Sequence, residues 1–198
     1  MSEYSAQEMM QAHLYQRLEQ TAEALRKNRM GACWVKTKEE ALEKVRGMLK
    51  EGAVVANGGS MTLGECGIME LLRSGAYQFL DREAVPREAV AEIYHKAFSA
   101  DYYLMSSNAV TESGELYNVD GNGNRVAALI YGPQTVIVVA GANKLVPDLP
   151  AAVQRMKTVA APVNAMRLQQ ETPCAKSGVC AGLRGDMAAG CRCESRIC

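Results

Sequence analysis

Hydrophobic positions change their spacing several times along the chain, and each spacing predicts a different element. Residues 5–28 place leucines on one helical face and charged or amide side chains on the other, which is typical of an amphipathic helix. Ser5 and Glu8 have the spacing of a capping box at the start of this helix. The same spacing at Thr37 and Glu40 predicts a second helix that ends near residue 50.

Short apolar runs alternate with amphipathic segments through the rest of the chain. The runs predict strands, at residues 31–36, 52–56, 77–80, 101–106 and 135–140, and the segments predict helices, at residues 68–73, 87–99 and 149–160. Such alternation predicts an α/β fold with a mostly parallel sheet flanked by helices. Residues 116–119 and 125–131 predict a hairpin or meander around the turn at 120–124, and thus an antiparallel excursion.

Composition and charge exclude several classes of protein. The chain has 198 residues with 22 basic and 22 acidic side chains, so it lacks the basic excess of a nucleic-acid binder. Its longest apolar stretch is far shorter than the roughly 20 residues of a membrane-spanning helix. The first residues contain no apolar signal-peptide core. We therefore expect a cytoplasmic protein with no membrane span and no nucleic-acid partner.

Cysteines divide the chain into two parts. Five of the seven cysteines lie in the last 25 residues, and the composition changes near Thr172. This predicts an α/β domain over residues 1–171 and a cysteine-rich tail over residues 172–198. In a reducing compartment clustered thiols are typical metal or redox groups, and four thiolates suffice for zinc or an iron–sulfur cluster. The candidate metal ligands are Cys174, Cys180, Cys191, Cys193 and Cys198. Their spacing matches no standard motif, so a terminus with metal-free thiols is the alternative.

A glycine-rich loop over residues 57–67 follows one predicted strand and precedes a helix. Backbone N–H groups of glycines and a helix N-terminus both favour an anion, and hydroxyl and carboxyl side chains lie beside them. The candidates here are Gly58, Gly59, Ser60 and Thr62 as ligand contacts and Glu65 as an acid–base group. The loop has neither a Gly-x-Gly-x-x-Gly nor a Walker A pattern, so nothing supports NAD or ATP. A tight strand-to-helix turn without a ligand is the alternative.

A second polar run over residues 106–125 connects predicted strands. Its candidates for ligand contact are Asn108, Thr111, Asn124 and Arg125, with Glu112 as a further acid–base candidate. A guanidinium can bind a carboxylate or phosphate in bidentate fashion, which makes Arg125 a candidate anion clamp. Two hairpin turns with polar residues are the alternative. Lys144 follows the most apolar strand and is a candidate for anion binding or proton transfer, or else a solvated lysine.

Several of these segments together resemble the LUD-domain (lactate-utilisation) family, in particular its short, stand-alone members. The matching segments cover most of the chain from about residue 30 onward, and they keep one order. They are Val55–Leu63, Ser107–Glu115, Asp120–Arg125, Tyr131–Pro133, Gly141–Asp148, Asn164–Leu168, Thr172–Cys180 and Arg196–Cys198.

The resemblance implies a fold like that of the ribose-5-phosphate isomerase, glucosamine-6-phosphate deaminase and CoA-transferase superfamily. It also implies a link to the oxidation of lactate to pyruvate beside an iron–sulfur protein partner. The tail departs from the family pattern because residues 182–190 separate Cys180 from the next cysteine. This departure leaves the ligand set and its metal open.

Three functions follow from these patterns, and whether the chain is an enzyme stays open. The leading interpretation is a protein of lactate or 2-hydroxyacid utilisation that binds a small anionic metabolite at the two polar loops. The first alternative is an electron-transfer or assembly subunit whose tail holds zinc or an iron–sulfur cluster. The second alternative is an interaction protein with neither ligand nor metal.

Overall fold

A four-stranded parallel sheet forms the centre of the computed structural model, which describes residues 5–183. Its strand order is β2-β1-β3-β6, and every neighbouring pair is parallel. The strands are β1 (Val54–Asn57), β2 (Gln78–Leu80), β3 (Tyr102–Met105) and β6 (Thr135–Val138). The predicted α/β class with a mostly parallel, helix-flanked sheet is therefore confirmed.

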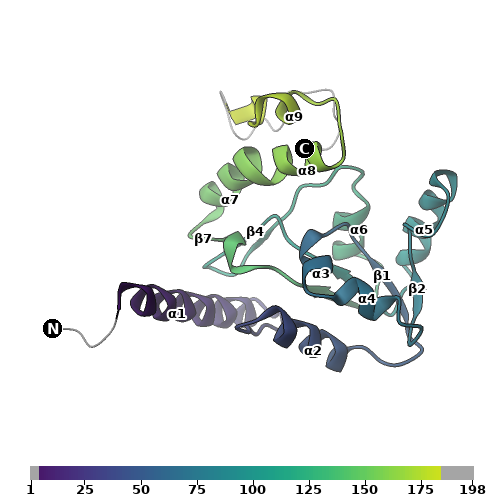
Figure 1. Cartoon of the computed structure of the whole chain (residues 1–198), viewed down its shortest axis with the longest axis horizontal. Helices are drawn as coiled ribbons and strands as arrows, with labels where there is room; N and C mark the ends of the chain where they lie inside the picture. The colour runs from purple at the N-terminus through teal and green to yellow at the C-terminus, as the bar shows by residue number, and fades with distance from the viewer. Residues whose placement is uncertain (1–4, 184–198) are drawn as a thin grey trace.

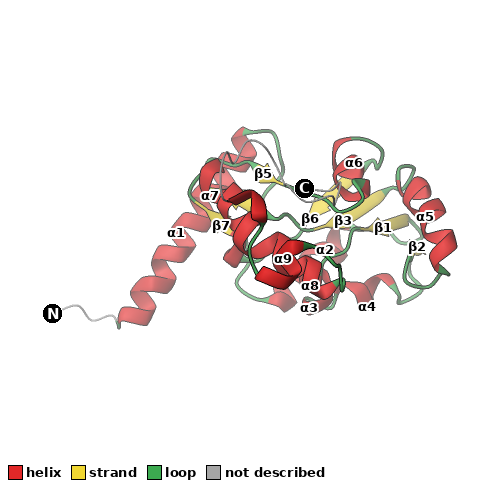
Figure 2. Cartoon of the chain, turned by 90° about the horizontal axis from the view of Figure 1, so that it is seen from above, coloured by secondary structure: helices red, strands yellow, loops and turns green. Residues whose placement is uncertain are grey.

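Helices cover both faces of this sheet, as Figure 2 shows from above. One face packs against α2 (Lys38–Met48), α3 (Met61–Glu65) and α4 (Ile68–Leu72). The other face packs against α5 (Val90–Ala97), which follows the short turn η1 (Arg87–Ala89), and α6 (Asn124–Ile130). Burial on both faces explains why the strands are nearly continuous apolar runs rather than alternating ones.

A smaller sheet lies beside the first and carries its own helical layer (Figure 1). Its order is β5-β4-β7, with β4 antiparallel to β5 and parallel to β7. The strands are β4 (Ala109–Thr111), β5 (Leu116–Tyr117) and β7 (Leu145–Val146), the last preceded by the turn η2 (Ala142–Lys144). The predicted antiparallel excursion is thus present, but the partner of β5 is β4 and not residues 125–131. The layer consists of α7 (Leu149–Arg155), the π-helical turn η3 (Met156–Ala160), α8 (Ala161–Arg167), α9 (Pro173–Ser177) and η4 (Ala181–Leu183).

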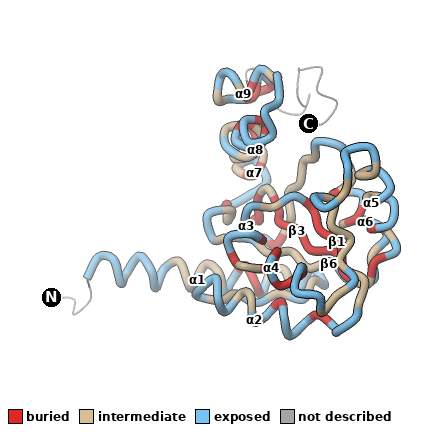
Figure 3. Tube along the Cα trace, turned by 45° about the vertical axis from the view of Figure 1, so that its right-hand side comes forward, coloured by how far each residue is buried: buried red, intermediate tan, exposed pale blue. Residues whose placement is uncertain are grey.

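The first helix, α1 (Ala6–Lys27), is long and only partly supported by the rest of the fold. Its predicted capping box is present, with Ser5 and Glu8 bonded in both directions. Thr21 and Ala22 are buried against the body, whereas every residue from 5 to 13 is exposed. Figures 1 and 3 accordingly show its first turns projecting away from the two sheets.

Three predicted elements differ from the structure. Residues 31–36 form no strand, because they have no ladder partner among the described residues. Residues 125–131 were predicted as a strand but lie in α6, where an Asp120 carboxylate oxygen accepts from the Val126 N–H in the first turn. The helix predicted to end at residue 160 continues through η3 into α8. Pro162 has no N–H to donate to the carbonyl of the residue four positions earlier. The wider π-helical turn η3 comes just before this proline.

The described part of the predicted tail packs on the helical layer. Cys174 and Cys180 lie in one buried cluster with Ala165 of α8. The Cys180 N–H donates to the Lys157 carbonyl at 2.9 Å. The domain boundary at residue 172 stays a prediction, and within residues 5–183 no helix combines the length and apolarity that a bilayer crossing requires.

Candidate functional site

Two polar segments meet at the carboxyl ends of β1 and β3. The chain leaves β1 to form β2 on one side of it, and later returns to form β3 on the other side. Such a reversal of strand order marks the usual ligand crevice of an open α/β sheet. Gly58 follows β1 directly and Ser106 follows β3 directly, and the Gly58 N–H donates to the Leu104 carbonyl at 2.9 Å.

The glycine-rich loop is shorter than predicted, because α3 forms inside it. Ser60 is the N-cap of α3, and its hydroxyl accepts from the Leu63 N–H at 3.3 Å. This contact explains the residue type at Ser60 without a ligand. Thr62 is the second residue of α3. Its hydroxyl accepts a hydrogen bond from Lys144, which lies in a distant part of the chain.

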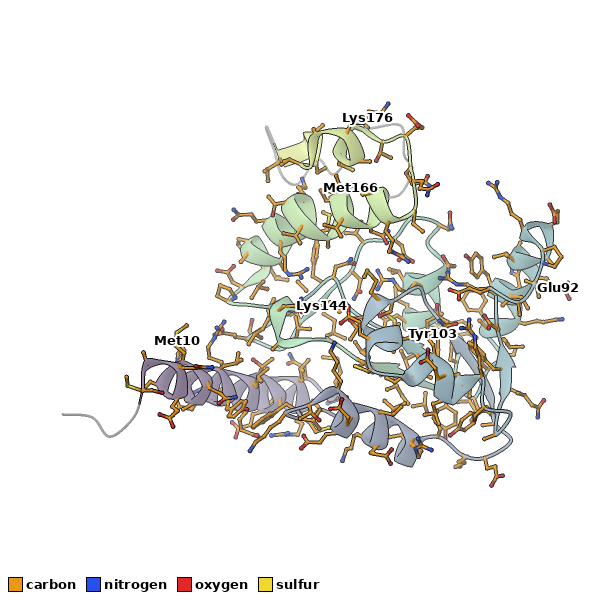
Figure 4. The ribbon with its side chains drawn as sticks, in the orientation of Figure 1. Met10, Glu92, Tyr103, Lys144, Met166 and Lys176 are labelled. Atoms are coloured by element: carbon orange, nitrogen blue, oxygen red, sulfur yellow. The ribbon has the colours of Figure 1, made fainter. Side chains whose placement is uncertain are left out.

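Lys144 is the centre of a small polar group that we call the Lys144 group, made of Lys144, Thr62, Ser106 and Arg155. The Lys144 ammonium donates to the Thr62 hydroxyl at 3.1 Å and to the Ser106 hydroxyl. These residues come from η2, α3 and the end of β3, so the fold brings together three distant segments. Figure 4 labels Lys144 near the centre of the view, below the layer of α7 and α8.

Burial and neighbouring cations lower the pKa of Lys144 to about 8. Burial is the main cause, and the positive charges of Arg155 and Arg125 add to it. Arg155 of α7 donates to the carbonyls of Asn143 and Asn108, and burial lowers its pKa as well. Lys144 therefore loses its proton far more easily than an exposed lysine.

The Lys144 group has no carboxylate of its own among the described residues. Neither Lys144 nor Arg155 makes an ion pair there, although the Glu65 charge is near enough to raise the Lys144 pKa. Glu65 itself is half exposed and pairs with Lys38 at 3.3 Å. Two partly buried cations without a counterion favour an anion at this place.

Arg125 is the second centre, and its N–H groups all donate to protein acceptors. Nε pairs with Asp120 at 2.8 Å, and the side chains of both residues are 11% exposed. The other acceptors are the Ser106 and Val119 carbonyls and the side-chain oxygens of Asn118 and Asn108. Because a guanidinium has five N–H donors, a ligand reaches Arg125 only by replacing one of these bonds. The anion clamp stays a prediction, and the observed contacts hold the second loop against β3.

The remaining predicted residues lie in other surroundings. Thr111 is fully buried and bonds Glu115 within its own turn. Glu112 pairs with Arg17 of α1 at 2.5 Å, so it anchors that helix. Asn124 lines a pocket on the α5 side of the sheet. The acid–base roles of Glu65 and Glu112 stay predictions, but the structure places neither carboxylate in the Lys144 group.

Close packing requires a glycine at position 58, whereas at position 59 the nearest atom is the mobile end of an arginine side chain. A Cβ on Gly58 would lie 2.9 Å from the Arg125 Cγ and 3.1 Å from the Tyr103 hydroxyl. A Cβ on Gly59 would lie 2.6 Å from the Arg82 Nη2. The glycines therefore let the loop approach two arginines.

Sequence reasoning omitted Ser106 and Arg155 from the candidate site. Ser106 carried a usable signal, since a polar residue directly after a buried strand lies at the carboxyl edge of the sheet. Arg155 carried none, because a basic residue in the last turn of a helix is usually explained by the helix dipole. Only the packing of α7 beside η2 reveals its role.

Two of the five candidate metal ligands are described. Cys174 and Cys180 are 5% and 2% exposed and belong to one buried cluster. Cys191, Cys193 and Cys198 lie outside the described residues. Within residues 5–183, no group of three or more His, Cys, Asp or Glu side chains is placed to hold a metal ion, so the metal set stays a prediction.

Comparison with known proteins gives one family match for this chain. No curated protein matches the chain. The sequence model of the LUD domain matches residues 18–198, which include both sheets, the Lys144 group and the cysteine-rich tail. The chain therefore belongs to the LUD-domain (lactate-utilisation) family.

Proposed function

We propose that this protein binds a small carboxylate metabolite of the 2-hydroxyacid class at the Lys144 group. The observation that carries the proposal is the pair of partly buried cations, Lys144 and Arg155, which lack a carboxylate partner among the described residues. Membership of the LUD-domain family supports the choice of lactate or a close relative.

The residue types of the Lys144 group suit both ends of a 2-hydroxyacid. An ammonium and a guanidinium favour the carboxylate. The Thr62 and Ser106 hydroxyls, which already contact Lys144, can donate to or accept from the ligand hydroxyl. With a pKa of about 8, Lys144 is also the group best suited to hold or release a proton there.

The test compares lactate with its uncharged amide, lactamide, by isothermal titration calorimetry at pH 7. We expect lactate to bind the wild-type protein and lactamide to bind at least tenfold more weakly. Lys144→Met should weaken lactate binding at least tenfold, since it keeps the apolar stem but removes the charge. Lys27→Met makes the same substitution at an exposed position of α1 and is the matched control.

Two results would contradict the proposal. One is lactate binding by Lys144→Met with the affinity of the wild-type protein. The other is equal binding of lactate and lactamide, which would show that the carboxylate is not recognised. Pyruvate and glycolate extend the series, because they remove the hydroxyl donor and the methyl group respectively.

We also propose a second function, metal binding by the cysteine tail, with an iron–sulfur protein as the partner in lactate oxidation. Its support is the burial of Cys174 and Cys180 in one cluster, as expected of two ligands of one site. Thiolate ligands suit zinc or an iron–sulfur cluster, and such a cluster would supply one-electron transfer.

Anaerobic purification followed by metal and acid-labile sulfide analysis tests this second function. We expect bound iron with sulfide, or zinc alone, and loss of the metal in Cys174→Ser. Cys33→Ser changes an exposed cysteine outside the predicted metal set and is the control. Protein that contains less than a tenth of an equivalent of any metal after anaerobic purification would refute the metal site.

A further inference from the structure

A pocket on the opposite face of the main sheet is not explained by the Lys144 group. It lies between the carboxyl ends of β1 and β2, the middle of β3, helix α5 and the start of α6, and it is open to solvent. Its polar lining comes from Arg82, Tyr94, Tyr103 and Asn124. We call it the Arg82 pocket. In Figure 4, Tyr103 is labelled in the body of the fold and Glu92 marks α5.

Tyr103 contributes a hydroxyl with no hydrogen-bond partner among the described residues. The residue is only 2% exposed, and burial raises the pKa of its phenol to about 12, so the hydroxyl keeps its proton and remains a donor. The hydroxyl is not among the fully buried polar atoms without a partner, and Tyr103 lines the pocket, so the hydroxyl can donate a hydrogen bond to a group that binds there.

Arg82 places a cation at the same pocket. Within the described residues its one hydrogen bond is from Nη1 to the Tyr94 hydroxyl at 3.4 Å, and it forms no ion pair. Most of its five N–H donors therefore remain available. Its guanidinium also lies close to Gly59, since a Cβ on Gly59 would be 2.6 Å from the Arg82 Nη2.

From these contacts we infer that the Arg82 pocket is a second binding site, which takes a phosphate-sized oxyanion. The Arg82 guanidinium supplies the charge, and the Tyr94 and Tyr103 hydroxyls and the Asn124 amide supply neutral donors from other directions. Several donors around one cation suit a compact group whose oxygens point in several directions.

The two sites are linked through Arg125. The side chain of Arg125 lies against the Gly58 position, beside the Tyr103 hydroxyl, and its Nη1 donates to the Ser106 carbonyl. Ser106 in turn contacts Lys144. The oxyanion is either free phosphate or the phosphate of a phosphorylated metabolite. The inference does not depend on the binding of lactate at the Lys144 group.

Inorganic phosphate is the first probe, measured by isothermal titration calorimetry on the full chain at pH 7 in a buffer without oxyanions. We expect Arg82→Gln and Tyr103→Phe each to weaken phosphate binding at least tenfold. Arg87→Gln makes the same charge change at an exposed position of η1 and should leave it unchanged. Lys144→Met should also retain phosphate binding, which separates this inference from the lactate proposal.

Stability provides a second readout that a purely structural role would not reproduce. Because its hydroxyl has no partner, Tyr103→Phe should melt no lower than the wild-type protein without phosphate, yet lose the phosphate-induced rise in Tm. Failure of phosphate to bind the wild-type protein would overturn the inference, as would wild-type phosphate affinity in both variants. A sugar phosphate that binds at least tenfold more tightly than phosphate would identify the metabolite form of the ligand.

Discussion

Replacing Lys144 by methionine should stabilise the ligand-free protein while it removes lactate binding. In the folded protein, burial and the neighbouring arginines lower the Lys144 pKa from an ordinary 10.5 to about 8. At pH 7 the lysine is therefore held in its charged form at a cost that the unfolded chain does not bear. Methionine keeps the length of the side chain and removes that cost.

The magnitude follows from the pKa change. A shift from 10.5 to about 8 corresponds to roughly 3 kcal/mol at neutral pH, and partial exposure reduces it to roughly 2 kcal/mol. The variant also loses the hydrogen bonds to Thr62 and Ser106, together worth about 1 kcal/mol. We expect a net stabilisation of about 1 kcal/mol, or a rise in Tm of about 2–4 °C.

Urea unfolding between pH 7 and pH 10 is the assay. Above pH 8 the folded protein releases the Lys144 proton while the unfolded chain still holds it. Wild-type stability should therefore rise from pH 8 toward pH 10.5 relative to that of Lys144→Met. The reasoning is refuted if the variant is less stable at pH 7, or if the stability difference between the two proteins does not change with pH.

Three further predictions concern residues around the site. Arg125→Met should lower the free energy of unfolding by about 3–5 kcal/mol in urea titrations, because it leaves a buried carboxylate unpaired; a loss below 1 kcal/mol would contradict this. Gly58→Ala should cost about 1–3 kcal/mol by overpacking, whereas Gly64→Ala, which meets no atom within 4 Å in α3, should be neutral or stabilising by Tm. Glu112→Gln breaks a half-exposed pair with Arg17, so it should cost less than about 1 kcal/mol and leave lactate affinity unchanged in calorimetry.

Local signals in the sequence were sufficient for the elements that depend on local contacts. The capping box at Ser5 and the N-cap at Thr37 place the starts of α1 and α2, because each hydroxyl accepts from the N–H of the residue three positions later. At Thr37 the box is not closed, since the Glu40 carboxylate accepts from the Lys36 N–H. The apolar runs of β1, β3 and β6 are visible for a similar reason, since both faces of each strand are buried.

Elements that depend on distant contacts were not predictable in this way. Residues 31–36 have the composition of a strand but find no neighbouring strand in the described structure. The segment that forms α6 also reads as a strand, yet Asp120 caps its first turn and Arg125 is drawn inward by several acceptors. Periodicity in a single segment carries no information on such partners.

The candidate site likewise contains residues that the sequence reveals and residues that only the fold reveals. Thr62 and Lys144 were visible as polar residues beside strand ends, and the structure brings their side chains within 3.1 Å. The sequence does not show that every N–H donor of Arg125 is bonded within the protein. The five acceptors come from residues 106–120, which fold around the guanidinium. Arg82 and Tyr103 became candidates only once α5 and the sheet enclosed a common space.

The uneven support of α1 divides one continuous helix into two units of local unfolding. Its second half is held by Thr21 and Ala22 in the core, by the Arg17–Glu112 pair and by the Asn28 amide on the Gly114 carbonyl at 2.9 Å. Among residues 5–183, its first turns are held by hydrogen bonds within the helix and by the Ser5 cap. Amide hydrogens before residue 13 should therefore exchange with solvent by fraying, and those after Arg17 only when the body itself opens.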